Sequence, residues 1–274
     1  MKYLALAAVG LFLFAGTVLA HDHSSVPTSP AAPQAAPQIP RTVDAWQIQM
    51  ADAQDLMATK DYEQAAHIFT TLTRTYPDNY AAWNMLGVAL QQLGQIDSAR
   101  DAYKHATKLN SKFAEAYNNI GTTWYQEQRY GRAIREYRKS IAENPNLASA
   151  YSNLGCAYFN EKKYPEAVAA FNKALSIDPD VFALGSYAGT LLQDRSVSDH
   201  GTFYFLLAKS YAERNDPADC AQYLRKAFDE GYKNVPAVKT DPSFAKVLAD
   251  PGVQAIVDKA EANGVEKPPA APGT

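Results

Sequence analysis

Three adjacent residues supply the side-chain types of a hydrolase triad. Ser198, Asp199 and His200 carry a hydroxyl, a carboxylate and an imidazole, but adjacency in the chain does not create the geometry that activates a serine. We interpret the stretch as a turn and a helix start, because Ser196 and Asp199 have the spacing of a capping box. The chain lacks phosphate-loop, zinc-protease and nucleophile-elbow motifs. The sequence therefore predicts no enzyme and no catalytic residue, with an active site in 182–264 as the minor alternative.

Metal chemistry has one candidate, which depends on processing. Residues 1–20 have the basic start, apolar middle and small final residues of a secretory signal peptide. Cleavage after Ala20 would place His21 and His23 at a new N-terminus, where a free amine and a His in third place suit Cu(II) or Ni(II). The alternative is a solvated linker start that binds no metal. We expect no other metal site and no cofactor.

The same segment predicts the compartment. Export would make the product periplasmic or secreted, and the alternative is an inner-membrane anchor formed by residues 3–20, because the apolar run approaches the roughly 20 residues of a membrane span. Residues 21–40 contain five prolines and residues 265–274 contain three, so both are predicted to be loose. A net charge of −3 gives no strong attraction to nucleic acid. A membrane is a partner only if the signal segment stays uncleaved.

Composition favours a helical, folded chain. The sequence is 47% apolar, which excludes disorder throughout, and its 11% aromatic content with only 14 glycines favours long helices over turn-rich sheet. Two cysteines, Cys156 and Cys220, are too few for a disulfide-dense scaffold or a four-cysteine zinc site. We expect both to be small apolar fillers, with a disulfide between them as the alternative.

The middle of the chain repeats every 34 residues. An aromatic residue, a glycine, an alanine and a second ring each recur at that spacing, in the sets Trp83, Tyr117, Tyr151; Gly87, Gly121, Gly155; Ala99, Ala133, Ala167; and Tyr103, Tyr137, Phe171. Apolar residues within each unit recur at three- and four-residue steps, which indicates two amphipathic helices separated by a polar break. The glycine and alanine would let the two helices approach closely, and the second ring would fill the gap to the next unit.

The spacing divides the chain into stacked units. One helix pair cannot bury its apolar face alone, so the units must pack on one another. The predicted organisation is four units at 46–79, 80–113, 114–147 and 148–181, an insertion at 182–200, a degenerate fifth unit at 201–234, and C-terminal capping helices at 235–264.

These registers resemble the tetratricopeptide repeat family. The fourth unit matches the family pattern well, through Tyr151, Leu154, Gly155, Ala167 and Phe171. The resemblance covers 46–181 and implies an all-α, right-handed superhelical solenoid of antiparallel helix pairs. It also implies a non-enzymatic scaffold that binds an extended peptide or a partner protein in a concave groove. The export pattern of residues 1–20 indicates an exported bacterial type.

Carried over by position, the resemblance implies a set of groove residues on the first helix of each unit. Asn119 and Asn153 match the asparagines with which the family holds a peptide backbone, and Tyr125 and Phe159 would anchor apolar side chains. No Lys or Arg stands at these places, which favours a neutral or mildly apolar ligand. The full predicted set is Asn84, Gln91, Asn118, Asn119, Thr122, Tyr125, Ser152, Asn153 and Phe159.

A basic run follows the second helix of the third unit. It comprises Arg129, Arg132, Arg135, Arg138 and Lys139, interrupted by Glu136. Such a run is usually a solvated face, and the alternative is a docking strip for phosphate or lipid head groups. An alternative function follows from it: an accessory or regulatory subunit of an envelope enzyme or assembly complex, docking through 182–200 and this strip.

Overall fold

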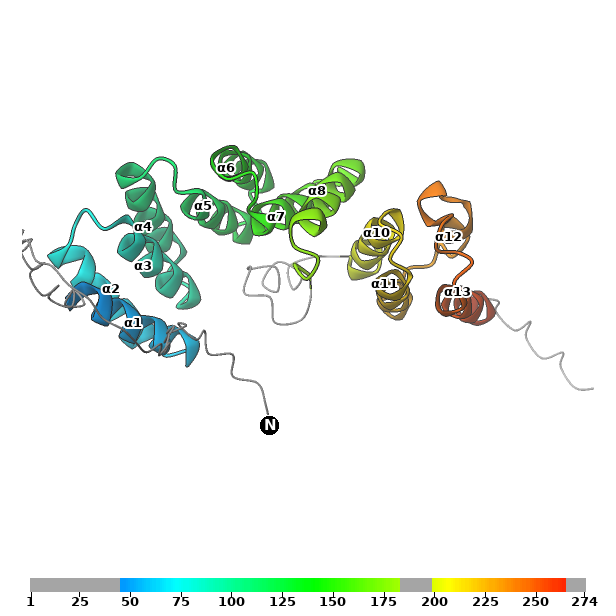
Figure 1. Cartoon of the computed structure of the whole chain (residues 1–274), viewed down its shortest axis with the longest axis horizontal. Coiled ribbons are helices and arrows are strands. Elements are labelled where there is room, and N and C mark those ends of the chain that lie inside the picture. Colours follow the sequence, from blue (N-terminus) through cyan, green and yellow to red (C-terminus); the bar gives the residue numbers. More distant parts are fainter. Residues whose placement is uncertain (1–44, 183–198, 265–274) are drawn as a thin grey trace, which may run out of the picture. The chain divides into compact units, whose positions relative to one another are not determined.

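The computed structural model describes residues 45–182 and 199–264, and within these ranges it contains helices and no strand. The predicted all-helical solenoid of paired helices is confirmed. The signal segment, the linker, the tail and most of 182–200 lie outside the described residues. Figure 1 labels the helices: α1 (Ala45–Ala58), α2 (Tyr62–Thr75), α3 (Tyr80–Gln92), α4 (Ile96–Leu109), α5 (Ala114–Gln126), α6 (Tyr130–Glu143), α7 (Ala148–Asn160), α8 (Tyr164–Ile177), α10 (His200–Glu213), α11 (Pro217–Asp229), α12 (Pro236–Thr240) and α13 (Pro251–Gly264).

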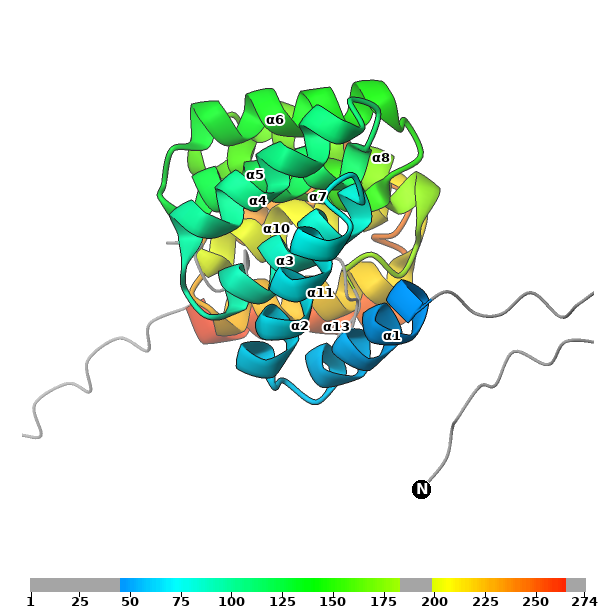
Figure 2. The same ribbon diagram turned by 90° about the vertical axis from the view of Figure 1, so that its left-hand side faces the viewer.

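Neighbouring helices pack as pairs. The pairs are α1 with α2, α3 with α4, α5 with α6, α7 with α8, and α10 with α11, and each pair contacts the next through its second helix. Figure 2 shows the same helices turned by 90°. We number these pairs as units 1 to 5. The second helices of units 1 to 4 begin at Tyr62, Ile96, Tyr130 and Tyr164, so the 34-residue spacing in the sequence is the spacing of helix starts.

Each bend between the two helices of a unit contains one residue in the left-handed backbone region. Lys60, Gly94, Gln128, Lys162 and Asn215 have φ values of 66°, 75°, 60°, 59° and 59°. An L-residue with a side chain pays a steric cost in this region that glycine avoids. Only the bend of unit 2 uses glycine, so the other four bends are held in place by the helices around them.

The repeated glycine and the second ring meet inside each unit. A Cβ on Gly87 or Gly121 would lie 2.5 Å from the ring of Tyr103 or Tyr137, and Gly155 is approached by Phe171 in the same way. The ring therefore lies first on the glycine of its own unit, where the sequence predicted contact with the next unit. It reaches the next unit as well, because Tyr103 also shares a buried cluster with Ile120.

The C-terminal segment packs against unit 5. Its helices α12, η1 (Pro242–Phe244) and α13, with the turn between η1 and α13, bury a group of apolar side chains in the same core as α10 and α11: Val238, Phe244, Val247, Val253 and Val257. Asp241 and Asp250 precede prolines, and their carboxylates accept backbone N–H groups at 3.0 Å from Ser243 and 2.8 Å from Gly252. These contacts begin the two helices and fix the covering segment in place.

A candidate binding surface on the first helices

The first helices of units 2 to 4 are almost free of charge. Among the residues of α3, α5 and α7 the only charged one is Glu115, whereas α4 and α6 contain several acidic and basic residues each. Charged side chains therefore cover the second helices, and amide, hydroxyl and apolar groups remain on the first. We define the first-helix surface as the accessible side chains on one face of these three helices: Met85, Val88, Gln91, Gln92, Asn119, Thr122, Gln126 and Asn160.

Two asparagine pairs join successive first helices beneath this surface. Asn119 donates from Nδ2 to Oδ1 of Asn84 at 3.0 Å, and Asn153 donates in the same way to Asn118 at 2.9 Å. Asn84, Asn118 and Asn153 are 7%, 7% and 0% exposed. A buried amide needs partners. Asn84 and Asn118 accept from the following unit, and Asn153 donates to the preceding one. The pairs therefore act between repeats and hold neighbouring units in register.

A second polar contact extends along the accessible edge. Gln91 donates from Nε2 to Thr122 at 3.2 Å and to Gln126 at 3.1 Å, and its Oε1 accepts the Tyr103 hydroxyl at 2.8 Å. Burial raises the pKa of Tyr103, so this phenol keeps its proton and remains a donor. Asn160 donates to the Tyr125 hydroxyl at 2.6 Å. Polar groups thus run from α3 to α7 without a charge among them.

Six of the nine predicted groove residues are buried: Asn84, Asn118, Tyr125, Ser152, Asn153 and Phe159. Tyr125 and Phe159, expected to anchor ligand side chains, are 1% and 4% exposed because their rings pack on Tyr130 and Tyr164 of the next helix. A ligand cannot reach these groups in this arrangement. The predicted residues that stay accessible are Gln91, Asn119 and Thr122.

Three accessible amides were missed by the sequence prediction. Gln92, Gln126 and Asn160 end the three first helices and none is buried. Successive members are 34 residues apart, so the sequence did contain a recurring amide. It lies one residue after the predicted groove positions Gln91, Tyr125 and Phe159. These three amides extend the first-helix surface toward the bends.

The basic run lies on α6 and its N-cap, where its five residues are exposed. Part of it is committed to neighbours. Arg138 donates to the Tyr158 hydroxyl at 2.6 Å, and Lys139 pairs with Glu136 at 3.0 Å. Arg129 lies 3.4 Å from a Glu127 oxygen. We call Arg129, Arg132, Arg135, Arg138 and Lys139 the basic row.

The other chemical candidates do not form a reactive site in the described residues. Asp199 is the N-cap of α10 and accepts the Thr202 N–H at 2.9 Å; this corrects the predicted capping box, in which Asp199 would lie inside the helix. His200 stacks near Tyr204, while Ser198 lies outside the described residues. His21 and His23 lie outside them too. Within 45–182 and 199–264 no group of three His, Cys, Asp or Glu residues could hold a metal.

Both cysteines are buried, and within the described residues no disulfide joins them. Burial raises the pKa of the Cys220 thiol to about 12, with Asp216 and Asp250 adding to the shift. A thiol with so high a pKa is a poor nucleophile at neutral pH. Among the described helices none is long and apolar enough to cross a membrane.

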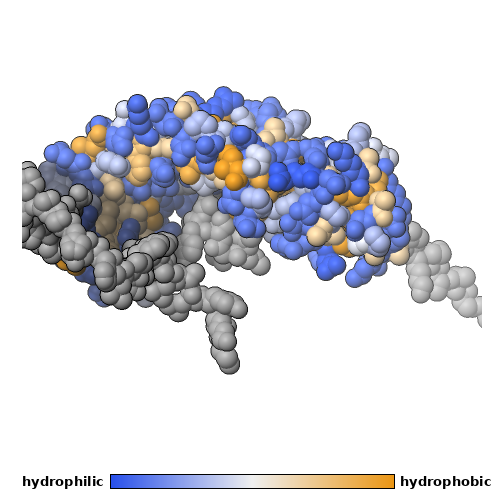
Figure 3. Space-filling view, in the orientation of Figure 1, coloured by the Kyte–Doolittle hydropathy of each residue, from blue (hydrophilic) through white to orange (hydrophobic). Residues whose placement is uncertain are grey.

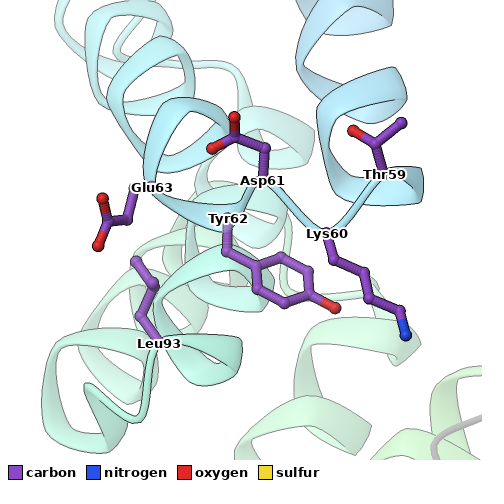
Figure 4. Close-up of a pocket in the computed structure, with 6 residues that line it drawn as sticks. All are labelled: Thr59, Lys60, Asp61, Tyr62, Glu63 and Leu93. Atoms are coloured by element: carbon purple, nitrogen blue, oxygen red, sulfur yellow. The ribbon is translucent and has the colours of Figure 1, made fainter.

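A cavity of about 440 Å³ lies at the bend of unit 1 (Figure 4). It is lined by Thr59, Lys60, Asp61, Tyr62 and Glu63, with Leu93 from the end of α3. Asp61 caps α2 through the Gln64 N–H at 3.3 Å, and the Thr59 hydroxyl donates to carbonyls of its own helix. The cavity therefore contains no paired nucleophile and base, and we assign it no function.

Stacked pairs of helices, each packed on the next, define a helical-repeat solenoid. Family models described as tetratricopeptide repeat match residues 50–104, 88–148 and 148–181. This region of the chain therefore belongs to the tetratricopeptide repeat family. Proteins of this family generally act in protein–protein interaction, and the fold is typically a non-catalytic scaffold.

Similar proteins share parts of this architecture. A 57-residue stretch is 39% identical to superkiller complex protein 3 of Homo sapiens and of Mus musculus, covering 21% of this chain and 4% of those proteins. PilF of Pseudomonas aeruginosa is 17% identical, covering 80% of this chain and 89% of its own, with a TM-score of 0.51. MamA of Desulfovibrio magneticus RS-1 is 19% identical, covering 69% and 96%, with a TM-score of 0.47. At these identities the solved structures show similarity of fold alone.

Proposed function

We propose that this chain is a non-enzymatic scaffold of the cell envelope or secreted space that holds an extended, largely uncharged segment of a partner protein on the first-helix surface. The observation that carries the proposal is the separation of charge, which leaves amides and hydroxyls on α3, α5 and α7. Side-chain amides can both donate to and accept from a peptide backbone. An extended segment needs such partners because its own N–H and C=O groups are unpaired.

The accessible amides suit a segment that crosses several units. Gln92, Gln126 and Asn160 recur once per unit, and Met85 and Val88 add apolar area at the α3 end. The asparagine pairs beneath them fix the spacing between units, so the accessible groups are presented at a constant interval. The export part of the proposal rests on residues 1–20, whose sequence has the pattern of a signal peptide.

Site-specific photocrosslinking tests this proposal. A benzoylphenylalanine would replace Gln126 on α5 in one variant and Lys108 on α4 in a matched variant, since both side chains are exposed. We expect a partner protein to crosslink at Gln126 and not at Lys108 in cells that produce the chain. Crosslinking at Lys108 alone, or at neither position, would contradict the assignment of the first-helix surface.

N-terminal sequencing of the recovered chain tests the compartment. A mature N-terminus at His21 in a periplasmic or culture fraction supports export with cleavage after Ala20. A chain that retains Met1 in the membrane fraction supports the anchored alternative, and a chain that retains Met1 in the soluble cytoplasmic fraction contradicts export.

A further inference from the structure

We propose that the N-terminal half of the basic row, together with Trp124, binds an acidic segment of a partner protein. Three guanidinium groups surround the Trp124 indole. Their carbon atoms lie 3.8 Å (Arg100), 4.7 Å (Arg132) and 5.5 Å (Arg129) from the ring centre. Cation–π attraction within about 6 Å holds an arginine over an aromatic face. This site is separate from the first-helix surface, and its ligand is acidic where the ligand of that surface is uncharged.

Arg100 is the structural member of the group. It is 5% exposed, and it donates to Thr123 at 2.9 Å and to Asp97 at 2.8 Å while also pairing with Glu127. Two carboxylates compensate its charge, which is the arrangement a buried guanidinium requires. Arg100 therefore fixes the indole, and it is not available to a ligand.

Arg132 and Arg135 are the members that remain available. Both are exposed, and within the part of the chain that the structure describes neither side chain makes a hydrogen bond or an ion pair. Stacking on an indole uses the flat face of a guanidinium and leaves its N–H donors pointing outward in the plane. Trp124 thus orders Arg132 without consuming the donors that would grip a carboxylate.

The surrounding charges select a narrow ligand. Residues three apart on a helix advance about 4.5 Å along its axis, so the arginines at 129, 132 and 135 form a short linear array. Glu127 pairs with Arg129, Glu136 follows Arg135 in the chain, and the whole chain carries −3. A broad anionic surface such as a membrane or nucleic acid would meet these carboxylates. A single acidic peptide that lies along the array would avoid these carboxylates. The face of the molecule seen in Figure 3 is mostly hydrophilic.

Fluorescence anisotropy with a defined probe tests the site. The full chain would be titrated with fluorescein-labelled octaglutamate in about 50 mM salt, where screening of exposed charges is modest. We expect Arg132→Gln/Arg135→Gln to weaken binding about tenfold, the effect of losing two charge-assisted contacts. The matched control is Lys104→Gln/Lys108→Gln on α4, which removes the same charge elsewhere and should weaken binding by about twofold or less.

A second variant distinguishes the site from general electrostatic attraction. Trp124→Leu leaves every charge in place, yet it should weaken octaglutamate binding about threefold because the stacking that orders Arg132 is lost. Trp124→Phe keeps a ring and should recover most of the affinity. Circular dichroism would confirm that both variants remain folded. If Trp124→Leu unfolds, the octaglutamate affinities of Trp124→Phe and of the two double variants decide whether the site exists.

Three results would overturn the proposal. Equal losses in the two double variants would show that net charge alone attracts the probe. Wild-type affinity in a folded Trp124→Leu variant would remove the role of the indole. Vesicles of phosphatidylcholine and phosphatidylglycerol that bind through Arg132 and Arg135, while octaglutamate does not, would assign the site to a membrane. None of these results affects a neutral segment held on the first-helix surface, so the two proposals fail separately.

Discussion

Units 2 to 4 and the junction between units 4 and 5 are held together by different contacts. The first helices of units 3 and 4 donate asparagine amides to the unit before them, from Asn119 in unit 3 and from Asn153 and Asn160 in unit 4. At the junction of units 4 and 5 the corresponding residue on α10 is Leu206, and aromatic contacts replace the amide pair. The ring centre of Phe203 lies 5.5 Å from that of Phe159 and 5.8 Å from that of Phe171. Asparagine pairs join the first helices at the earlier junctions, whereas aromatic contacts and one hydrogen bond from Asn172 to Glu213 join units 4 and 5.

The comparison shows where a binding surface can be built. Amide pairs hold successive units in register while further amides at the ends of the same helices remain accessible. At the α8–α10 junction Leu206 is buried, and Lys209 and Glu213 place charges where unit 3 has Thr122 and Gln126. Ala208 stands where the earlier units have glycine. The uncharged surface therefore belongs to units 2 to 4, and unit 5 with its covering helices closes the apolar core.

The largest expected effect concerns the glycine contacts that units 2 to 4 share. Gly121→Ala should lower the free energy of unfolding by about 3 kcal/mol, because the new Cβ would overlap the buried Tyr137 ring. Gly131→Ala on the exposed face of α6 is the control, and it should raise stability by about 0.5 kcal/mol through helix propensity. Urea unfolding measures both. Changes of the same sign would show that close helix contact is not what the glycine provides.

A smaller effect is expected from the buried asparagine of unit 4. Asn153→Ala should cost about 2 kcal/mol, because it leaves the buried Asn118 carbonyl oxygen without its donor. Asn119→Ala should cost about half as much, because Asn119 itself is only partly buried. Thermal and urea unfolding of the two variants give the comparison. A larger loss for Asn119→Ala would contradict the account of the asparagine pairs.

The covering segment at unit 5 should respond to acid. Partial burial alone would raise the pKa of Asp241, but hydrogen bonds from Lys209 and Ser243 outweigh it and lower the pKa below its usual value. A carboxylate with a lowered folded pKa stabilises the fold above its unfolded pKa of about 3.9 and loses that contribution as pH falls through the folded pKa. Asp241→Asn should therefore cost about 1 kcal/mol at pH 7 and almost nothing at about pH 2. A cost that is equal at both pH values would contradict the ion pair's role.

The smallest effect is expected at the bends. Gln128→Gly should raise stability by about 0.5 kcal/mol, because glycine relieves the left-handed backbone at a small entropic cost. Gly94→Ala in the equivalent bend should lower it by about 1 kcal/mol, although nothing lies within 4 Å of the added Cβ. Parallel thermal melts of the two variants would measure these shifts. A stabilising Gly94→Ala would show that the bends are not strained.

The sequence was sufficient to predict the fold because the same helix-pair pattern occurs several times along the chain. The 34-residue spacing recurs in the starts of the second helices at 62, 96, 130 and 164, and the glycines at 87, 121 and 155 predicted the close approach of the two helices in each unit. Each feature is needed for the two helices of one pair to pack together. Because the same residues recur in several units, the pattern can be distinguished from a chance match.

The accessible surface was harder to predict because neighbouring positions on a helix differ by about 100° in direction. Tyr125 and Gln126 are adjacent, yet the first is 1% exposed and the second is exposed. Phe159 is likewise buried, whereas Asn160 beside it is half-buried. Which of two adjacent residues faces outward depends on how the next pair packs, and Asn153 was predicted at the surface although unit 3 already uses its amide. Register between units is a property of the stack and not of one unit.

Calorimetric titration of the partner segment crosslinked at Gln126 tests the central claim most directly. The segment would be titrated into the wild-type chain and into Gln91→Ala/Gln126→Ala, each at about 50 mM and about 500 mM salt, where screening lengths differ severalfold. We predict a clear loss of affinity in the double variant and nearly the same wild-type affinity at both salt concentrations, because the first-helix surface carries amides and no charge to screen. Full affinity in the double variant, or binding that disappears at high salt, would contradict the assignment of an uncharged recognition surface to units 2 to 4.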